Sequence, residues 1–470
     1  MMRTLFIKEV RDALSSRRFW VILALCLILI PLGVEVSLKD YQTRLQNYRE
    51  AVRIYREETK QVQDVLYKEG AKAFAPPAQL SFLSLGLELV LPNVAETPAG
   101  RADPPVVMRL GNNESRDNLY EFFTGPLDLV FVVAVVMSLL AVILTYGAIS
   151  GEKELGTLGQ VLSNSVPRAK IILAKATANG LVLVIPFLLS LILSLTLVEL
   201  QGGLPSAAGA WTSIGLGALV SVLLVGVFFN LGLFVSSLTK QAVPALVTLL
   251  LVWVFLYGVY PRLAAAAAQI LHPVKSDALV ALEKSQIKHD IEKARDAELE
   301  TVAQTMPRDF KSEAFKAGQK KQQEIHDRYQ AKLEAGWKAI DRDVEARRST
   351  RDALTADIAR LSPVSSFVRP MAELARSGWL ESGQFRREVR QYEEVLNREI
   401  FDKQRIIRMP RGGMISNEAD PKAPAPVFAY VPTPEDDVVR DILPDVALLI
   451  LFNLVFFAGA FVTFLRYDPR

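Results

Sequence analysis

Residues Ile149–Lys170 read ISGEKELGTLGQVLSNSVPRAK, and they separate one long apolar stretch from the next. Apolar residues recur in this segment at helical spacing and would give a short helix one apolar face: Leu155, Leu158, Val161 and Leu162. Glu152, Gly156 and Gly159 share another face, because residues three or four positions apart are neighbours on a helix. Pro167 stops the helix before the next apolar stretch begins. The pattern predicts a short amphipathic helix along a membrane face, although the same composition also fits an ordinary polar connection between spans.

The apolar stretches on either side belong to a chain of mixed character. Of its 470 residues 50% are hydrophobic and the mean hydropathy is +0.22, yet 22% are charged. Six stretches reach or approach the ~20 apolar residues that a bilayer-spanning helix needs. They are Phe19–Leu38, Leu127–Ile149, Ile171–Val198, Trp211–Leu238, Ala242–Tyr260 and Leu443–Leu465. The sequence therefore predicts an all-α integral membrane protein with six transmembrane helices. No small-residue cleavage site follows the first stretch, so it is predicted to be a retained span rather than a signal peptide.

Lysine and arginine are distributed unevenly among the connections between these spans. They precede the first span, gather around the connection 150–170 and follow the last span, whereas the connection Glu199–Ala210 contains none. Because cationic connections are retained on the cytoplasmic side, both termini and the 150–170 loop are predicted to be cytoplasmic. This orientation places two large insertions, residues 39–126 and 261–442, outside the membrane.

The predicted organisation therefore has six parts. They are a cytoplasmic interfacial (elbow) helix at 1–18, the first span at 19–38, a first extracytoplasmic insertion with a helical stalk at 39–126, spans two to five with a cytoplasmic coupling loop 150–170 at 127–260, a second extracytoplasmic helical insertion at 261–442, and the last span with a cytoplasmic tail at 443–470.

Both insertions carry apolar stripes typical of packed helices. In the first, apolar residues recur in alternating steps of four and three, along a helix that continues out of the first span: Tyr41, Leu45, Tyr48, Val52, Tyr55, Thr59, Val62 and Leu66. The second carries a similar stripe: Ile325, Tyr329, Leu333, Trp337, Ile340 and Val344, then Leu354, Ile358 and Leu361. Pro307 separates that helix from an earlier one near 276–304. We expect the two stripes to cover each other and form one helical extracytoplasmic domain; the alternative is that they dock another protein of the cell envelope.

Several kinds of functional site are excluded by the residue pattern. Gly151 and Gly156 have the spacing of a phosphate-binding loop, but the lysine that would reach the phosphates is missing. The single cysteine, Cys26, lies in an apolar run, and the three histidines are too scattered to hold a metal. The formal net charge of +3 and the lack of a concentrated basic face argue against nucleic acid. We expect no catalytic residue, no metal site and no cofactor on this chain.

Polar residues within or near the spans raise a separate question. Asn230 and Asn453 could line a substrate path, although asparagines in spans more often bond between helices. Glu35, Asp128 and Asp445 lie near span ends, where the outer interface is expected, and ordinary solvation accounts for them there.

The 150–170 segment resembles the signature loop of ABC-2 type transporter permeases, in which E-K-E-x-G-T-L follows the second span. The matching residues are Glu152, Lys153, Glu154, Gly156, Thr157 and Leu158. The opening TLFIKEVRDALSSRRFW is similar to the elbow helix of that family, and its polar residues here are Lys8, Glu9 and Arg11. The stretches PPAQLSFLSLGLELVLP and LSPVSSFVRPMAEL more loosely resemble a large-insertion branch related to gliding-motility and copper-enzyme-maturation permeases. The resemblance spans the whole chain, but only the opening helix and the loop are specific.

This resemblance implies a membrane subunit in the bacterial inner (plasma) membrane, driven by a separate cytoplasmic ATPase dimer that holds ATP and Mg²⁺. The loop helix of such permeases seats in a groove on the ATPase, so the matching loop residues are the expected contacts. A second membrane half, either another copy or a related permease, is also implied, with membrane lipid around the spans. The rival hypothesis is a mechanical transmitter that moves an extracytoplasmic envelope partner and transports nothing.

Overall fold

The computed structural model describes residues 14–61, 71–88, 90–97, 107–109, 127–162, 167–204, 208–305, 313–396, 406–408, 414–416 and 427–467, together with residues 7, 11 and 307. The chain folds into two units, one made of Met1–Gly258 and Leu361–Arg470 and the other of Val259–Arg360. Within the predicted interfacial helix, Arg11 is helical and exposed, whereas Lys8 and Glu9 lie outside the described residues.

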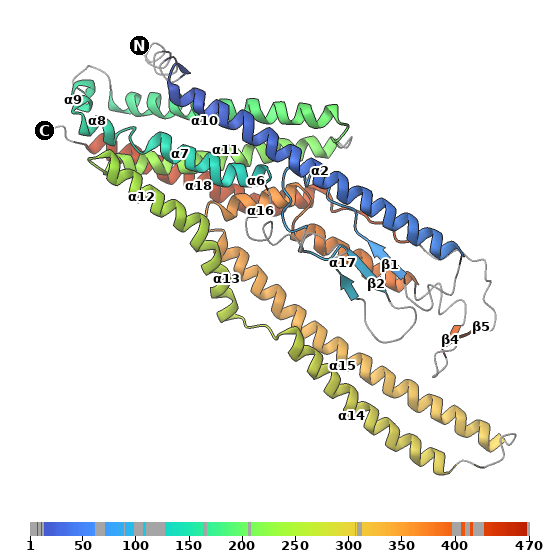
Figure 1. Cartoon of the computed structure of the whole chain (residues 1–470). Helices are drawn as coiled ribbons and strands as arrows, with labels where there is room; N and C mark the ends of the chain where they lie inside the picture. Colours follow the sequence, from blue (N-terminus) through green and yellow to red (C-terminus); the bar gives the residue numbers. More distant parts are fainter. Residues whose placement is uncertain are drawn as a thin grey trace. The chain divides into compact units, whose positions relative to one another are not determined.

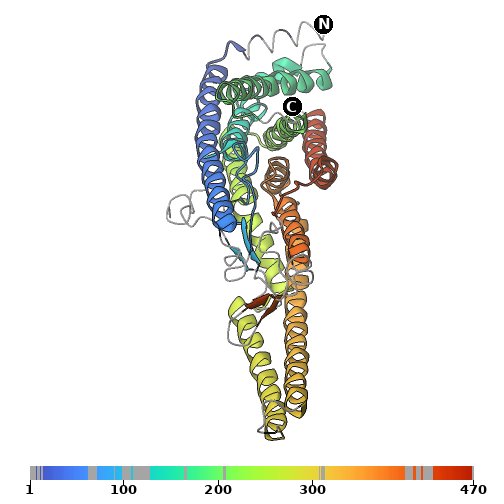
Figure 2. The ribbon, with the colours of Figure 1, turned by 90° about the vertical axis from the view of Figure 1, so that its right-hand side faces the viewer.

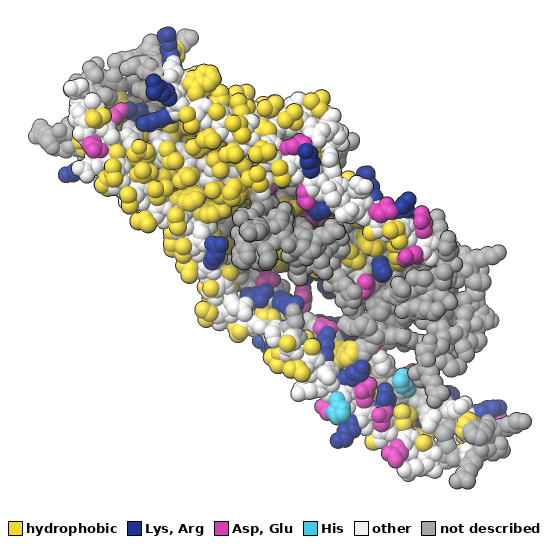
Figure 3. Space-filling model, viewed as in Figure 1, with side chains coloured by type: hydrophobic (Ala, Val, Ile, Leu, Met, Phe, Trp, Pro, Cys, Tyr) yellow, Lys and Arg dark blue, Asp and Glu magenta, His cyan; other side chains and the backbone are white. Residues whose placement is uncertain are grey.

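Six helical stretches in the described residues are long and apolar enough to cross a membrane, as the sequence predicts. They are α2 (Arg17–Gln61), the run α6 (Leu129–Phe131), η1 (Val132–Met137) and α7 (Ser138–Thr145), α10 (Arg168–Leu200), α11 (Ala208–Leu238), the run α12 (Ala242–Val254), η2 (Phe255–Val259) and α13 (Tyr260–Leu271), and α18 (Glu435–Arg466) (Figure 1). Hydrophobic side chains cover the visible face of this bundle, and lysine and arginine gather near the end where the 150–170 loop lies (Figure 3). The chain is therefore an all-α integral membrane protein.

Helix α11 is the central helix of the first unit, because it packs against both α7 and α18. Two glycines of α11 allow this approach: a Cβ at Gly226 would lie 2.7 Å from Oδ1 of Asn453, and one at Gly232 would lie 1.8 Å from Oγ1 of Thr145. Lipid supplies no hydrophobic force between helices, so small residues that permit close contact stabilise the bundle. A second pair of neighbours, α2 and α10, packs beside it.

The first insertion begins as a continuation of α2 and then becomes a small sheet. The 45 residues of α2 correspond to about 68 Å, more than twice the ~30 Å hydrocarbon core. Strands β1 (Ala71–Phe74), β2 (Val94–Thr97) and β3 (Val107–Arg109) form an antiparallel sheet in the order β1-β2-β3. The sheet is absent from the sequence-based prediction of helices alone, because strands of three and four residues are too short to display an alternating pattern.

The described residues of the second insertion that belong to the first unit include two helices and a hairpin. Helix α16 (Ser365–Leu374) packs across α11 and α18. Helix α17 (Trp379–Leu396) buries Phe385, Val389 and Tyr392 in one cluster with three alanines of the sheet, Ala71, Ala73 and Ala95. Strands β4 (Ile406–Arg408) and β5 (Met414–Ser416) pair as an antiparallel hairpin. The two insertions thus share a core, in which a helix packs on a sheet.

The second unit is built on a helical hairpin. Helices α14 (Asp277–Gln304) and α15 (Glu313–Ala359) run side by side (Figures 1 and 2). Helix α13 packs against the C-terminal part of α15. Ser276 caps α14 by accepting a hydrogen bond from Leu279 N at 3.3 Å. The stripe of α15 is covered within this unit: Ile325, Leu333 and Val344 are buried.

The prediction that the stripes of the two insertions cover each other is therefore wrong. The α15 stripe packs on α14, its neighbour in sequence, which a short connection brings back at little entropic cost. The α2 stripe finds its contacts in the first unit, where Tyr41 packs on the main core. Further along α2, the Tyr55 ring meets Phe74 edge-on at 5.8 Å, and its hydroxyl accepts a hydrogen bond from Lys72 N at 2.9 Å.

Candidate coupling loop

The 150–170 segment folds as two very short helices rather than one. Helix α8 (Ser150–Glu154) has Leu155 at its C-cap position, and α9 (Thr157–Leu162) starts two residues after that cap. Between them Gly156 has φ of +70°, the left-handed conformation that side chains disfavour. A Cβ on Gly156 would meet nothing within 4 Å, so this glycine provides the turn and not a close approach of backbones.

Glu154 links the loop to the start of the fifth span. Its Oε2 accepts a hydrogen bond from Ala242 N at 2.9 Å, and Ala242 is the first residue of α12. The residue at the cap position of α12, Gln241, makes no side-chain cap of its own. The first N–H groups of a helix have no partner within that helix and carry a partial positive charge. Glu154 therefore serves as the cap of α12 from a distance in sequence.

Lys153 links the loop to the C-terminal end of α11. Its Nζ donates hydrogen bonds to the carbonyl oxygens of Ser237 and, at 3.1 Å, Thr239, which end α11. The last carbonyls of a helix carry a partial negative charge, so a cation is favoured there. The same ammonium lies 4.9 Å from the centre of the Tyr467 ring, just after α18. One side chain thus joins the loop to α11 and to the end of α18.

Glu152 makes the third attachment, an ion pair with Lys175 of α10. Both side chains are largely buried, so water screens the pair less than it would an exposed one. Arg168, at the start of α10, donates hydrogen bonds to the backbone oxygens of Leu465 at 3.0 Å and Tyr467 at 2.8 Å. The end of the last span is therefore tied to both sides of the loop.

Neutral contacts fix the base of the loop. The Ser236 hydroxyl of α11 accepts hydrogen bonds from Ile149 N at 3.1 Å and Ser150 N at 3.0 Å and donates one to Ser150 Oγ. Leu158 is buried in the main core, with 1% of its surface exposed. Sequence reasoning missed Ser236 and Tyr467, because they lie far from the loop along the chain and carry no pattern of their own. Lys175 was counted only among the cations that set the orientation, since its partner could not be inferred from the sequence.

The predicted contact residues thus divide into two groups. Glu152, Lys153 and Leu158 face the protein, and Glu154, although more exposed, is bonded to α12. Gly156 and Thr157 are exposed, and so is Leu155, with 78% of its surface accessible. Leu155 is therefore exposed at the tip of a loop that charged contacts hold in place. The contact of any of these residues with an ATPase stays a prediction.

Two asparagines of the spans, Asn230 and Asn453, lie together in the bundle. Asn230 of α11 donates a hydrogen bond to Asn453 Oδ1 of α18 at 2.8 Å. The Asn453 amide in turn donates to the carbonyls of Leu223 and Leu449, both at 2.9 Å. The structure therefore shows the interhelical bonding that the sequence favoured. A role of these two residues in a substrate path stays a prediction.

Two carboxylates expected to be solvated are instead buried at the other end of the bundle. Asp128 is 3% exposed and caps α6, because it accepts hydrogen bonds from Phe131 N at 2.8 Å and Leu85 N at 3.1 Å. Asp445 is fully buried and pairs with Arg369 of α16. The prediction was wrong for both, since their partners come from the insertions and cannot be inferred from the span sequence. Glu35 alone of the three keeps substantial exposure, beside Lys39 and Gln201.

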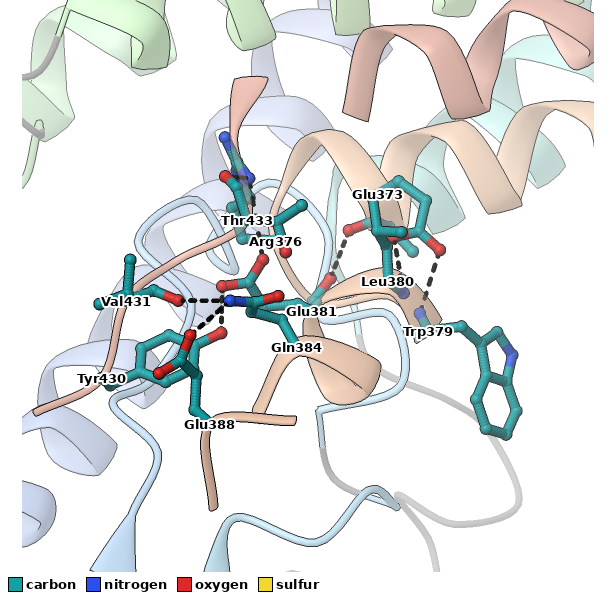
Figure 4. A network of polar contacts seen from close by, with 12 residues as sticks. Glu373, Arg376, Trp379, Leu380, Glu381, Gln384, Glu388, Tyr430, Val431 and Thr433 are labelled. Atoms are coloured by element: carbon teal, nitrogen blue, oxygen red, sulfur yellow. Dashed lines mark hydrogen bonds and ion pairs between the residues drawn. The ribbon is translucent and has the colours of Figure 1, made fainter. Parts of the chain in front are cut away.

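A polar network surrounds the turn between α16 and α17 (Figure 4). Glu373 accepts hydrogen bonds from Trp379 N at 3.0 Å and Leu380 N at 3.3 Å, which caps α17. Burial, reinforced by the charge of Asp441, raises the pKa of the Glu373 carboxyl to about 7 despite nearby Arg369. Arg376 has φ of +63° and donates a hydrogen bond to the Thr433 carbonyl.

Comparison with known proteins gives one result that covers most of the chain. The sequence profile of a family described as ABC-2 family transporter protein matches residues 3–368. A search of curated proteins finds no match. Within the residues that the structure describes, no group of His, Cys, Asp and Glu side chains could hold a metal ion.

Proposed function

Because the chain belongs to the ABC-2 family of transporter proteins, we propose that it is the permease subunit of an ATP-driven transporter and that its Ser150–Leu162 loop receives the movement of a cytoplasmic ATPase. Family membership implies a multi-pass membrane component that works with an ABC ATPase. ATP and Mg²⁺ would then be bound and used on that partner. We further propose that the chain belongs to the large-insertion branch of such permeases, because it carries two large insertions.

The observation that carries the proposal is the set of three charged attachments of one short loop. Glu152 joins it to α10, Lys153 to the end of α11, and Glu154 to the start of α12. Charge-assisted hydrogen bonds are short and roughly twice as strong as neutral ones, so the loop should move with these helices as one body. A push on exposed Leu155 would then reach three spans at once.

Orientation and assembly are parts of the same proposal. Lysine and arginine near the loop favour a cytoplasmic location for this end of the bundle and for both termini. The ATPase is expected as a dimer, so a second permease half, identical or related, would complete the transporter. The bacterial inner membrane is the expected location, since the family works in membranes and the positive charge follows the rule for that membrane.

A second candidate function is favoured by a specific feature. Helix α2 runs without interruption from the loop end of the bundle to Gln61, well past the length of a span. Such a helix could carry ATPase work to an envelope partner without any transport. A transported substrate separates the two functions, because only the permease would show ATP-dependent movement of a solute into or out of vesicles.

The experiment that tests the proposal is affinity purification of the tagged chain from its native membranes in mild detergent, with identification of the co-purified proteins. We expect a Walker-motif ATPase with the parental chain and its loss with Leu155→Arg, because an arginine would occupy the exposed tip. Leu200→Arg is the matched control, since Leu200 is 79% exposed but lies at the far end of α10. Intact parental protein that recovers no ATPase would refute the proposal.

A further inference from the structure

Helix α16 lies about one membrane thickness away from the coupling loop. Its Met371 sits against Gly217 of α11, where a Cβ would lie 3.4 Å from the methionine sulfur. Ser237, whose carbonyl binds the loop lysine, lies 20 residues further along α11. At 1.5 Å per residue this separation is about 30 Å, the thickness of the hydrocarbon core. Helix α16 therefore crosses the bundle at the end opposite the loop.

The apolar face of α16 covers a small pocket between the spans. Met371, Leu374 and Ala375 lie over Leu191 of α10 and Ile214 of α11. Leu80 and Leu83 of the first insertion close it from another side. The pocket leaves room for about one water molecule, so the side chains that line it pack closely beneath α16.

Hydrogen bonds hold the two insertions together over the pocket. The Ser377 hydroxyl, just after α16, donates to the Ser84 carbonyl at 2.8 Å, and Leu87 N donates to the Ser377 carbonyl at 2.9 Å. Gly86 between them has φ of +53°, and a Cβ there would lie 2.4 Å from Ser377 Oγ. Hydrogen bonds and a close backbone approach therefore join the two insertions beside the pocket.

Two ion pairs attach α16 to α18. Arg369 pairs through Nη2 with Asp441 Oδ2 at 2.6 Å and through Nη1 with Asp445 Oδ2. Asp445 is fully buried, so its charge depends on this arginine for compensation. An ion pair differs from an apolar contact in one respect: when it opens to water, both charges are hydrated, and the loss of the pair is largely offset. Such a contact holds firmly while dry and can part reversibly when wet.

We propose that α16 is a plug that shuts the bundle at the end opposite the coupling loop, and that the ion pairs of Arg369 with Asp441 and Asp445 are its latch. Opening separates α16 from α18, admits water to Asp445 and exposes the pocket residues of α10 and α11. For its part in transport the inference rests on the proposed function, since the substrate would leave past the displaced plug. The latch itself needs no ATPase and can be tested alone.

Cysteine reactivity tests the plug directly, because the chain has one cysteine and it is buried. Leu191, which lines the pocket and is buried, is changed to cysteine in a Cys26→Ala background, and the chain is placed in lipid nanodiscs. A water-soluble maleimide should label Leu191→Cys slowly with the latch intact. Arg369→Gln and Asp445→Asn, which break the latch from opposite sides, should each speed labelling by at least about tenfold. Arg369→Lys, which keeps the charge, should stay close to the parental rate.

The matched control is Arg440→Gln on the same helix, whose 3.9 Å ion pair with Asp437 is exposed and whose loss should leave labelling unchanged. Gel filtration identifies variants that keep their fold. A folded Arg369→Gln or Asp445→Asn chain that labels at the parental rate overturns the latch. If neither variant folds, a disulfide between Gly217→Cys and Met371→Cys decides. A cross-linked chain in which Leu191→Cys labels as fast as in the chain without this cysteine pair overturns the plug, and one that is protected supports it. Recovery of the ATPase is scored separately, so failure of the plug and failure of the proposed function are distinguishable.

Discussion

The carboxylate of Glu154 caps a helix that begins 88 residues later, by accepting the N–H of Ala242 at 2.9 Å. This bond joins the loop after the second span to the start of the fifth. A helix begins with unpaired N–H groups, and a carboxylate placed there both accepts a hydrogen bond and meets the positive end of the helix dipole. The glutamate that resembles a family signature thus has a structural partner within its own chain.

Removing this cap should cost stability without removing the ATPase. Glu154→Ala is expected to lower the free energy of unfolding by about 1 kcal/mol, the usual cost of losing a helix cap. Glu154→Gln keeps an acceptor oxygen and should lose less. Thermal unfolding in detergent measures both. Since the side chain is engaged with α12, ATPase recovery should persist in both variants, and its loss in Glu154→Gln would show that the carboxylate contacts the partner instead.

Two glycines of the loop should respond in opposite directions to the same substitution. Gly156→Ala places a Cβ at φ of +70° and is expected to destabilise by roughly 1–2 kcal/mol. Gly151→Ala lies within α8, where a Cβ meets nothing within 4 Å, and should be neutral or stabilising by up to about 1 kcal/mol. Thermal unfolding of the two variants under one set of conditions checks the pair. Equal effects would mean that the left-handed turn is not what Gly156 provides.

The asparagine pair in the bundle should behave as one unit. Asn230→Ala and Asn453→Ala are each expected to lower the free energy of unfolding, Asn453→Ala by more, because that amide also bonds two carbonyls. A double-mutant cycle should give a coupling of about 0.5–2 kcal/mol, the range for hydrogen bonds between helices in membranes. Stability measured by denaturation in mixed micelles provides the values. Additive effects would indicate that the two side chains act independently.

Stability should fall as pH rises through the pKa of Glu373. The folded-state pKa of about 7 exceeds the ordinary value of 4.5, so the native state binds more protons than the unfolded chain between these values. The contribution is therefore complete below pH 4.5 and is lost as pH approaches and passes 7, by at most ~3 kcal/mol. Melting temperatures from pH 5 to 8 test this, and Glu373→Gln should flatten the slope while losing one of the two capping bonds. An unchanged slope in that variant would assign the pH dependence to another group.

The positions of the spans were predictable because about twenty consecutive apolar residues indicate a membrane-spanning helix, whatever that helix packs against. The two helices on either side of Pro307 were also predictable from their own sequence patterns, but their packing on each other was not. The partners of charged residues were not, because Glu154 and Ala242, or Arg369 and Asp445, are joined only by the folded bundle. The burial of Asp128 and Asp445 was also not predictable from hydropathy. A carboxylate near a span end has the same sequence pattern whether it is solvated or paired.

A small tilt of helix α2 at the membrane would displace the far end of this helix by several ångströms. From Leu38, where the predicted first span ends, to Gln61 it extends for 23 further residues, or about 35 Å. A tilt of about 10° at the membrane would displace its far end by about 6 Å, twice the length of a hydrogen bond. Tyr55, part of the way along this lever, is bonded to Lys72 of the sheet at 2.9 Å. The sheet, and the α17 aromatic residues packed on it, would therefore be carried through an arc whenever the first span leans.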